Sequence, residues 1–324
     1  MNFSKLKKRW LSFWKTKTGK RISKTLQYVF IAIVIGYLIY QLTEIGWQRV
    51  WESLPVTPWF YVLFLFLYFA LPVSEQFIYG TSLNFSFKKG LPVFIQKKIY
   101  NADVLGYSGE AYFFIWAKNN LKESSGYIFG VIKDNNIISS ITSTLVAAVL
   151  LSVFLYVSQL NLQQIIEVDR EYFYYGALAV VLILASLIYF RHYIITMSSG
   201  MASKIFGIHL ARLLFVYSVE IIQWMVVMPE VPLYIWFTYM GIKIISTRIP
   251  FLPSRDLLFI GASLEISKFL NISGAGIAGI LLASNVLTKL MNLGLYSFLA
   301  FKGSLIKKEE TDSTQKATSE GDSG

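Results

Sequence analysis

Seven long apolar stretches dominate this chain of 324 residues and restrict the folds that it can adopt. A helix needs about 20 mostly apolar residues to cross the hydrocarbon core of a bilayer. Because that core has no water to pair with free backbone groups, helices are the expected solution. The stretches lie at residues 25–42, 58–79, 128–157, 172–190, 213–228, 233–246 and 276–300. The sequence therefore predicts an all-α, polytopic helical membrane bundle.

The composition supports this class and excludes several kinds of chemistry. Hydrophobic residues make up 55% of the chain and aromatic residues 16%. A soluble protein of this composition would expose much apolar surface. Cysteine is absent, which excludes disulfides and thiolate nucleophiles, and the only histidines are His192 and His209. We therefore expect no metal site, no cofactor and no catalytic triad.

Positive charge is concentrated at the N-terminus. Residues 1–24 hold nine lysines and arginines and no acid. Such a flank predicts a cytoplasmic N-terminus. The segment also contains Trp10, Phe13 and Trp14, so we expect it to lie on an anionic lipid leaflet rather than to bind nucleic acid. We expect the protein to reside in the cytoplasmic (inner) membrane of a prokaryote.

The number of spans is left open by two segments. Residues 91–117 contain two apolar pieces around a polar centre, each too short to span, and this pattern predicts one or two re-entrant or broken helices. The lysines before and within this segment (Lys88, Lys89, Lys97 and Lys98) indicate the cytoplasmic side. If residues 257–270 also cross the membrane, the bundle has eight spans instead of seven and the C-terminus is cytoplasmic. The polar tail at 301–324 is predicted to be disordered.

Two segments of the chain resemble each other. Residues 108–114 read SGEAYFF and residues 254–260 read SRDLLFI, so each has a serine, an acid two residues later and a phenylalanine at the same place. Serine followed by an acid is typical of a helix start, where the hydroxyl caps free amides and the carboxylate favours the positive end of the dipole. One interpretation is two ordinary helix starts. The other is an internal repeat, with halves of about 25–160 and 205–300, whose paired broken helices form a substrate site.

These motifs resemble a known family, the flippase-like membrane region of lysylphosphatidylglycerol synthases, as found in stand-alone members without the aminoacyl-transferase domain. The resemblance covers about residues 25–300. It rests on Gly109-Glu110-Ala111 after a polar turn, and on Ile249-Pro250 followed by Asp256 and Glu265. The resemblance implies about eight helices and movement of a lipid headgroup between leaflets, or a supporting role in the assembly of envelope lipids or glycans. It does not imply synthesis of lysyl-lipid, because the soluble transferase domain does not fit in this length.

Charged residues inside apolar segments supply the candidate site, because a central charge costs about 2.5–3.5 kcal/mol to insert. Glu220 has no cation nearby in the sequence and is expected to pair with a basic residue such as Lys243, or to serve a substrate or proton. Arginine can hold a phosphate through two parallel hydrogen bonds. We therefore expect Arg248 and Arg255 to receive a headgroup together with the helix start at Ser254. The full set of candidate substrate-binding residues is Ser108, Gly109, Glu110, Arg248, Ser254, Arg255, Asp256, Glu220 and Glu265.

Three functions remain open from the sequence. The first is lipid transport without an ATPase, since the chain has no P-loop and no dinucleotide-binding glycine motif. The second is a membrane transferase that modifies a lipid, with Glu110 or Asp256 as its base. The third is a scaffold subunit of an envelope assembly. A cavity favours transport, paired carboxylates around a water favour an enzyme, and a closely packed bundle favours a scaffold. The sequence leaves the lipid, the direction of transport and the oligomeric state undetermined.

Overall fold

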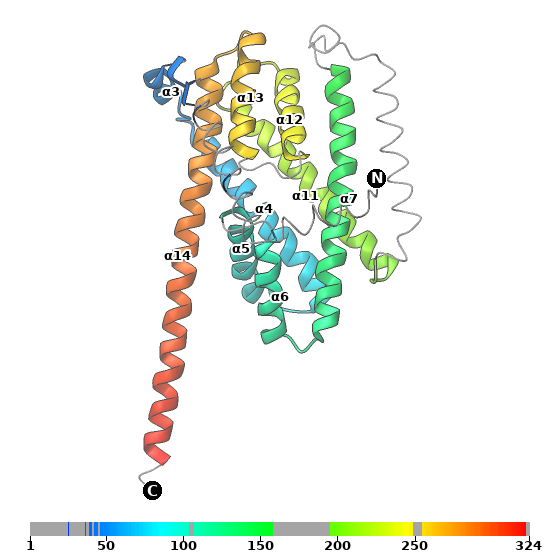
Figure 1. The fold of residues 1–324 in the computed structure, drawn as a ribbon, viewed down its shortest axis with the longest axis vertical. Helices are drawn as coiled ribbons and strands as arrows, with labels where there is room; N and C mark the ends of the chain where they lie inside the picture. The colour runs from blue at the N-terminus through cyan, green and yellow to red at the C-terminus, as the bar shows by residue number, and fades with distance from the viewer. Residues whose placement is uncertain are drawn as a thin grey trace, which may run out of the picture. The chain divides into compact units, whose positions relative to one another are not determined.

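The computed structural model describes residues 46–103, 107–157, 195–248 and 255–321, with a few residues before 46. Helices are the only regular secondary structure in these ranges (Figure 1). The predicted all-α class is therefore confirmed for this part of the chain. In order, the helices are α3 (Trp47–Glu52), α4 (Pro58–Leu83), α5 (Phe87–Asp103), α6 (Ser108–Asn120), α7 (Ser125–Val157), α11 (Ser199–Met225), α12 (Leu233–Arg248), α13 (Arg255–Phe269) and α14 (Gly274–Gly321).

Within the described ranges, three helices are long and apolar enough to cross a membrane: Pro58–Leu83, Ser199–Met225 and Gly274–Leu299. Each has at least 26 residues, or about 39 Å of helix, against a hydrocarbon core of about 30 Å. Leu233–Ser246 is a shorter apolar helix. The predicted spans at 25–42 and 172–190 lie almost wholly outside the described residues. The count of seven or eight spans therefore stays a prediction.

The segment expected to re-enter the membrane forms two helices rather than one. α5 has 17 residues and α6 has 13, so each is shorter than a span. Tyr107, just before α6, has a positive φ of 66°, and the turn lets α6 pack back against α5. The predicted pair of short helices is thus present. Its re-entrance into a bilayer stays a prediction.

The chain divides into two compact units, each made from separate stretches of sequence. The first unit comprises residues 1–57 and 224–285, and the second comprises residues 58–223 and 286–324. α14 contributes residues to both units and continues to Gly321, through most of the tail that was predicted to be disordered. That disorder and the predicted repeat halves stay predictions. The basic segment 1–24 lies outside the described residues.

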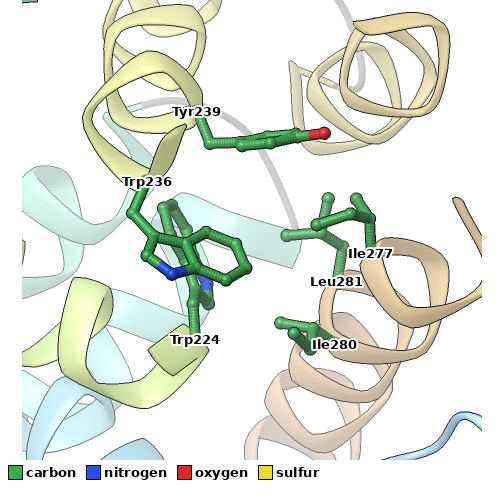
Figure 2. Close-up of a pocket in the computed structure, with 6 residues that line it drawn as sticks. All are labelled: Trp224, Trp236, Tyr239, Ile277, Ile280 and Leu281. Carbon is green, nitrogen blue, oxygen red and sulfur yellow. The ribbon is translucent and has the colours of Figure 1, made fainter. Parts of the chain in front are cut away.

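The first unit has an aromatic core next to the paired helices α12 and α13. The rings of Trp224 and Trp236 lie 5.7 Å apart, and those of Trp236 and Tyr239 lie 5.9 Å apart. These rings face three aliphatic side chains of α14 across a void of about 10 Å³ (Figure 2). A void of that size has room for about one water molecule. This apolar void is therefore a packing defect and not a ligand site.

The second unit is organised by α4, α5, α6 and α7. Tyr79 of α4 lies 5.4 Å from the ring of Phe94 in α5 and 4.5 Å from the ring of Phe113 in α6. All three side chains are completely buried. Aromatic contacts of this kind contribute about 0.5–1.5 kcal/mol each beyond the area that they bury. They hold the two short helices against α4.

A proline in α4 leaves one backbone carbonyl of that helix without a hydrogen-bond donor. Pro72 has no backbone N–H, so the carbonyl of Tyr68 four residues earlier loses its helical partner. Lys98 of α5 supplies the donor, with its Nζ 2.5 Å from that carbonyl oxygen. Asn292 of α14 accepts a hydrogen bond from the Tyr68 hydroxyl at 2.6 Å and donates one to Asp103 at 2.6 Å. These polar contacts tie the part of α4 around Pro72 to α5 and to the second-unit part of α14.

The half-buried position of Lys98 predicts a pH-dependent stability. Burial lowers the pKa of Lys98 to about 7 from its ordinary value of 10.5. Between these two values the unfolded chain binds a proton that the folded chain does not, so stability rises as the pH increases. The slope contributed by one such group is at most about 1.4 kcal/mol per pH unit. We expect the free energy of unfolding of the wild type to rise relative to that of Lys98→Met between pH 7 and 9.

The measurement is chemical unfolding of the purified protein in detergent at pH 7, 8 and 9. Lys98→Met also loses the contact to the Tyr68 carbonyl, which lowers its stability at every pH. The pH-dependent part of the difference between the two proteins therefore reports the titration of Lys98. Parallel pH profiles for the two proteins would contradict the lowered pKa.

Candidate functional site

Charged side chains meet inside the second unit around Lys97, which is 1% exposed. Its ammonium group pairs with the carboxylate of Glu75 in α4 and lies 3.4 Å from Oε1 of Glu110 in α6. Glu75 itself is 6% exposed. A buried charge is tolerated only when it is paired, because removing it from water costs several kcal/mol. Three helices are therefore held together by one lysine.

The Ser108-Gly109-Glu110 motif places Glu110 at this lysine. Ser108 donates its hydroxyl to the carbonyl of Tyr100 at 2.7 Å, and the Gly109 N–H donates to Oδ1 of Asn101 at 2.8 Å. A Cβ on Gly109 would lie 2.1 Å from the carbonyl oxygen of Lys97, which no side chain can accept. Glycine is thus required for α6 to approach α5. The close approach brings Glu110 within reach of Lys97.

The predicted helix start is confirmed at both motifs, since Glu110 and Asp256 each lie in the first turn of a helix. The predicted role of the first serine is wrong. Ser108 donates to α5 instead of capping α6, and Tyr107 precedes α6 without a side-chain cap. The contact to a neighbouring helix replaces the local cap because α6 starts directly against α5.

Two carboxylates share the single ammonium group of Lys97. Burial by itself disfavours the charge of Lys97, but the carboxylate of Glu75 and the neighbouring Glu110 outweigh it and raise the pKa of Lys97 above its ordinary value. The lysine therefore stays charged. Oε2 of Glu75 and Oε2 of Glu110 have no hydrogen-bond partner in the described part of the chain. The arrangement offers two unpartnered acceptor oxygens beside a fixed cation.

A neutral hydrogen-bond chain adjoins these charges. The ring of Tyr79 lies 5.3 Å from Nζ of Lys97, and its hydroxyl accepts a hydrogen bond from Nδ2 of Asn135 at 2.9 Å. Oδ1 of Asn135 then faces Nε2 of His209 at 2.9 Å. Because this oxygen only accepts, Nε2 of His209 carries the proton. Nδ1 of His209 has no partner among the described side chains.

Arg212 follows His209 by three residues on α11 and completes the set. Its guanidinium interacts electrostatically with the carboxylate of Glu75. Its Nε makes no hydrogen bond within the described ranges. The cluster thus presents both unpartnered acceptors and an unpartnered donor. We call these residues the buried polar cluster: Glu75, Tyr79, Lys97, Glu110, Asn135, His209 and Arg212.

The other predicted site residues lie elsewhere. Arg255 and Asp256 are exposed at the start of α13 in the first unit. Glu265 lies 3.4 Å from Lys268, which also approaches Glu44 at 3.6 Å. Ser254 and the side chain of Arg248 lie outside the described residues.

Glu220 is 9% exposed in α11 of the second unit. Its predicted pairing with Lys243 stays a prediction, because the two residues belong to different units. The same holds for the predicted substrate site formed by the two similar motifs, because Glu110 and Asp256 also belong to different units.

Most of the buried polar cluster was missed from the sequence. Lys97 was used only to indicate the cytoplasmic side, which stays a prediction, and its burial was not foreseen. Its position contained a signal, because Gly90, Val93, Phe94 and Lys97 follow the i, i+3, i+4, i+7 spacing of one helix face and all four are buried. Asn135 lies in a polar run at 133–136, and His209 and Arg212 are polar residues in the long helix α11. Nothing in the linear sequence shows that Asn135 contacts Tyr79 and His209, or that Arg212 lies near Glu75.

Among the described residues, no group of three or more histidines and carboxylates is arranged to hold a metal ion. No known family model, curated protein or solved structure matches this chain. The fold and the site define its class: an all-helical protein with helices apolar enough to span a membrane and a buried cluster of ionisable side chains.

The close approach at Gly109 predicts a sharp effect of one methyl group. Gly109→Ala forces a Cβ against the Lys97 carbonyl, and we expect a loss of about 2 kcal/mol or more in stability, as for overpacked cores. Gly126→Ala is the matched control, because Gly126 is also the second residue of a helix after a serine and has no atom within 4 Å of its added Cβ. Thermal unfolding in detergent measures both. Equal melting temperatures would show that α6 does not depend on the glycine.

The shared lysine predicts strong coupling between Lys97 and Glu75. Lys97→Met leaves a carboxylate buried without its cation, and we expect a loss of about 3–5 kcal/mol in stability. The double variant Lys97→Met with Glu75→Met removes both charges, so we expect it to be more stable than the single lysine variant. Unfolding free energies for the four proteins of this cycle test the coupling. Additive losses would show that the two side chains do not interact.

Proposed function

We propose that this chain is an integral protein of a prokaryotic cytoplasmic membrane that binds the headgroup of an anionic or zwitterionic lipid and moves it between leaflets. It would do so without an ATPase of its own, through a bundle of seven or eight spans with its N-terminus in the cytoplasm. The observation that carries the proposal is the buried polar cluster around Lys97 in a unit with apolar helices. Ionisable groups among such helices are costly and commonly mark a substrate path.

The chemistry of the buried polar cluster supports a headgroup as the substrate. Arg212 offers a donor for a phosphate oxygen, and Glu75 and Glu110 offer acceptors for hydroxyl or ammonium groups. Lys97 balances the carboxylates, so the empty site does not carry two uncompensated negative charges. A ligand with both donors and acceptors can replace these internal contacts with its own, so little electrostatic free energy is lost when it binds.

The resemblance to the membrane region of lysylphosphatidylglycerol synthases supports the same proposal. Gly109 and Glu110, which carry that resemblance, are the residues that bring α6 to Lys97. The second motif, with Arg248, Ser254, Arg255 and Asp256, would receive the headgroup at the first unit. The basic segment 1–24 would hold the protein on an anionic leaflet.

Transport is favoured over the two alternatives. A transferase would use Glu110 or Asp256 as a base, but the carboxylate of Glu110 is engaged by the ammonium group of Lys97 at 3.4 Å. A scaffold needs no cavity, whereas the second unit has an open cavity of about 600 Å³. A lipid-modifying enzyme would also leave a covalently altered lipid, which mass spectrometry of the reconstituted vesicles detects.

The experiment is a leaflet-accessibility assay on vesicles that contain the purified protein and a fluorescent phospholipid. Dithionite in the outer solution quenches only the lipids that reach the outer leaflet. We expect the wild type to expose inner-leaflet lipid faster than protein-free vesicles do. We expect Glu110→Gln to slow this exchange at least about tenfold, because a charged hydrogen bond contributes about 1.5–3 kcal/mol.

Glu123→Gln is the matched control, since Glu123 is an exposed acid between α6 and α7. It should exchange lipid at the wild-type rate. Equal rates for the wild type and for protein-free vesicles would refute transport. A wild-type rate for Glu110→Gln would remove the buried polar cluster from the mechanism.

A further inference from the structure

A cavity of about 600 Å³ lies in the second unit beside the start of α7. Its wall comes from the end of α4, the first turns of α7, and the residues that lead into α11. The volume falls within the range of about 300–1,000 Å³ that is usual for small-molecule sites. The lining residues used below are Gly126, Phe129, Lys133, Asp134, Met197 and Met201.

One wall of the cavity carries a pair of opposite charges. Nζ of Lys133 lies 3.1 Å from Oδ1 of Asp134, and the Lys133 side chain is 34% exposed. Asp134 is completely buried. Its Oδ2 accepts hydrogen bonds from the N–H and hydroxyl of Thr196, each at 2.8 Å, and from the N–H of Met197 at 2.9 Å. These bonds fix the carboxylate, while Oδ1 makes no hydrogen bond in the described part of the chain.

The cavity also has apolar lining. Phe129 of α7 is 62% exposed, and Met197 and Met201 are the other apolar residues used here. Methionine side chains are flexible and adapt to ligands of irregular shape. The lining is therefore amphipathic, with a charge pair and adaptable apolar groups around one cavity.

We propose that this cavity binds the zwitterionic phosphodiester headgroup of a membrane lipid, with Lys133 turning from Asp134 to the phosphate and the ammonium group taking the place of Lys133 beside Oδ1 of Asp134. A singly charged ligand would satisfy one member of the pair and leave the other without compensation in a partly buried site. A zwitterion satisfies both. The apolar lining receives the glycerol and the first carbons of the acyl chains. This inference rests on the proposed function and specifies the class of lipid.

The cavity adjoins the buried polar cluster through consecutive residues of α7. Asp134 lines the cavity, and Asn135 is the next residue and belongs to the cluster. His209 of α11, which contacts Asn135, lies less than three turns beyond Met201. The cavity is thus placed to receive a headgroup before it reaches the cluster.

The test is calorimetric binding to the full-length protein in a maltoside detergent, which carries no phosphate. The probes are glycerophosphocholine, glycerophosphoglycerol, choline, and dihexanoylphosphatidylcholine below its micelle concentration. We expect glycerophosphocholine to bind at least about tenfold more tightly than glycerophosphoglycerol or choline, because each of these lacks one charged contact. The dihexanoyl lipid should bind more tightly still.

Two matched pairs of variants locate the site. Gly126→Leu places a side chain in the cavity, where nothing lies within 4 Å of the added Cβ, and should abolish binding. Gly200→Leu is equally unobstructed at the second position of α11 and does not line the cavity, so it should bind like the wild type. Lys133→Gln should weaken binding about tenfold, whereas Lys122→Gln on the surface should not.

The outcomes separate this inference from the proposed function. Equal binding of glycerophosphoglycerol, or unchanged binding by Gly126→Leu, would overturn the zwitterion site even if Glu110→Gln stops lipid exchange. Equal affinities for glycerophosphocholine and the dihexanoyl compound would show a site for free headgroup compounds and contradict a lipid ligand. Binding as expected, in a protein that does not exchange lipid between leaflets, would uphold the site and refute transport.

Discussion

The arrangement of the second unit depends on the need to compensate the buried charge of one lysine. Lys97 cannot stay charged in an apolar interior without carboxylates, and α4 and α6 supply them through Glu75 and Glu110. α6 reaches this position only because Gly109 lets its backbone lie against the carbonyl of Lys97. The aromatic packing of Tyr79, which also lies under the ammonium group, follows from the same approach. The same contacts therefore pack α4, α5 and α6 together and form the buried polar cluster.

The neighbouring lysine has the opposite character. Lys98 donates to a carbonyl that Pro72 leaves free, and no carboxylate compensates its burial, so the pKa of Lys98 falls whereas that of Lys97 rises. Two adjacent residues of α5 thus contact two positions of α4 that are seven residues apart, Glu75 and the carbonyl of Tyr68. Pro72 and Glu75 belong to one short stretch where α4 departs from a uniform apolar span.

The sequence was informative where a physical rule acts locally. Apolar length located α4, α11 and the first part of α14, and the pairing of serine with an acid located the starts of α6 and α13. It was uninformative where partners are distant in the chain. Asn135 and His209 are 74 residues apart, and their contact depends on how α7 and α11 pack. The burial of Lys97 was not predicted because a lysine near other lysines was interpreted only as a mark of the cytoplasmic side, and only its helical spacing to Phe94 indicated burial.

The central claim is that the charges around Lys97 serve a substrate and are not merely a means of packing three helices. The double variant Lys97→Met with Glu75→Met separates these roles, because it keeps the volume of the interior and removes the buried Lys97–Glu75 ion pair, while Glu110 and Arg212 remain. The measurement is leaflet exchange of a fluorescent phospholipid by this variant in vesicles, after its thermal stability in detergent has been shown to match the wild type. The account predicts a folded protein that no longer moves lipid. A folded double variant that exchanges lipid at the wild-type rate would contradict it.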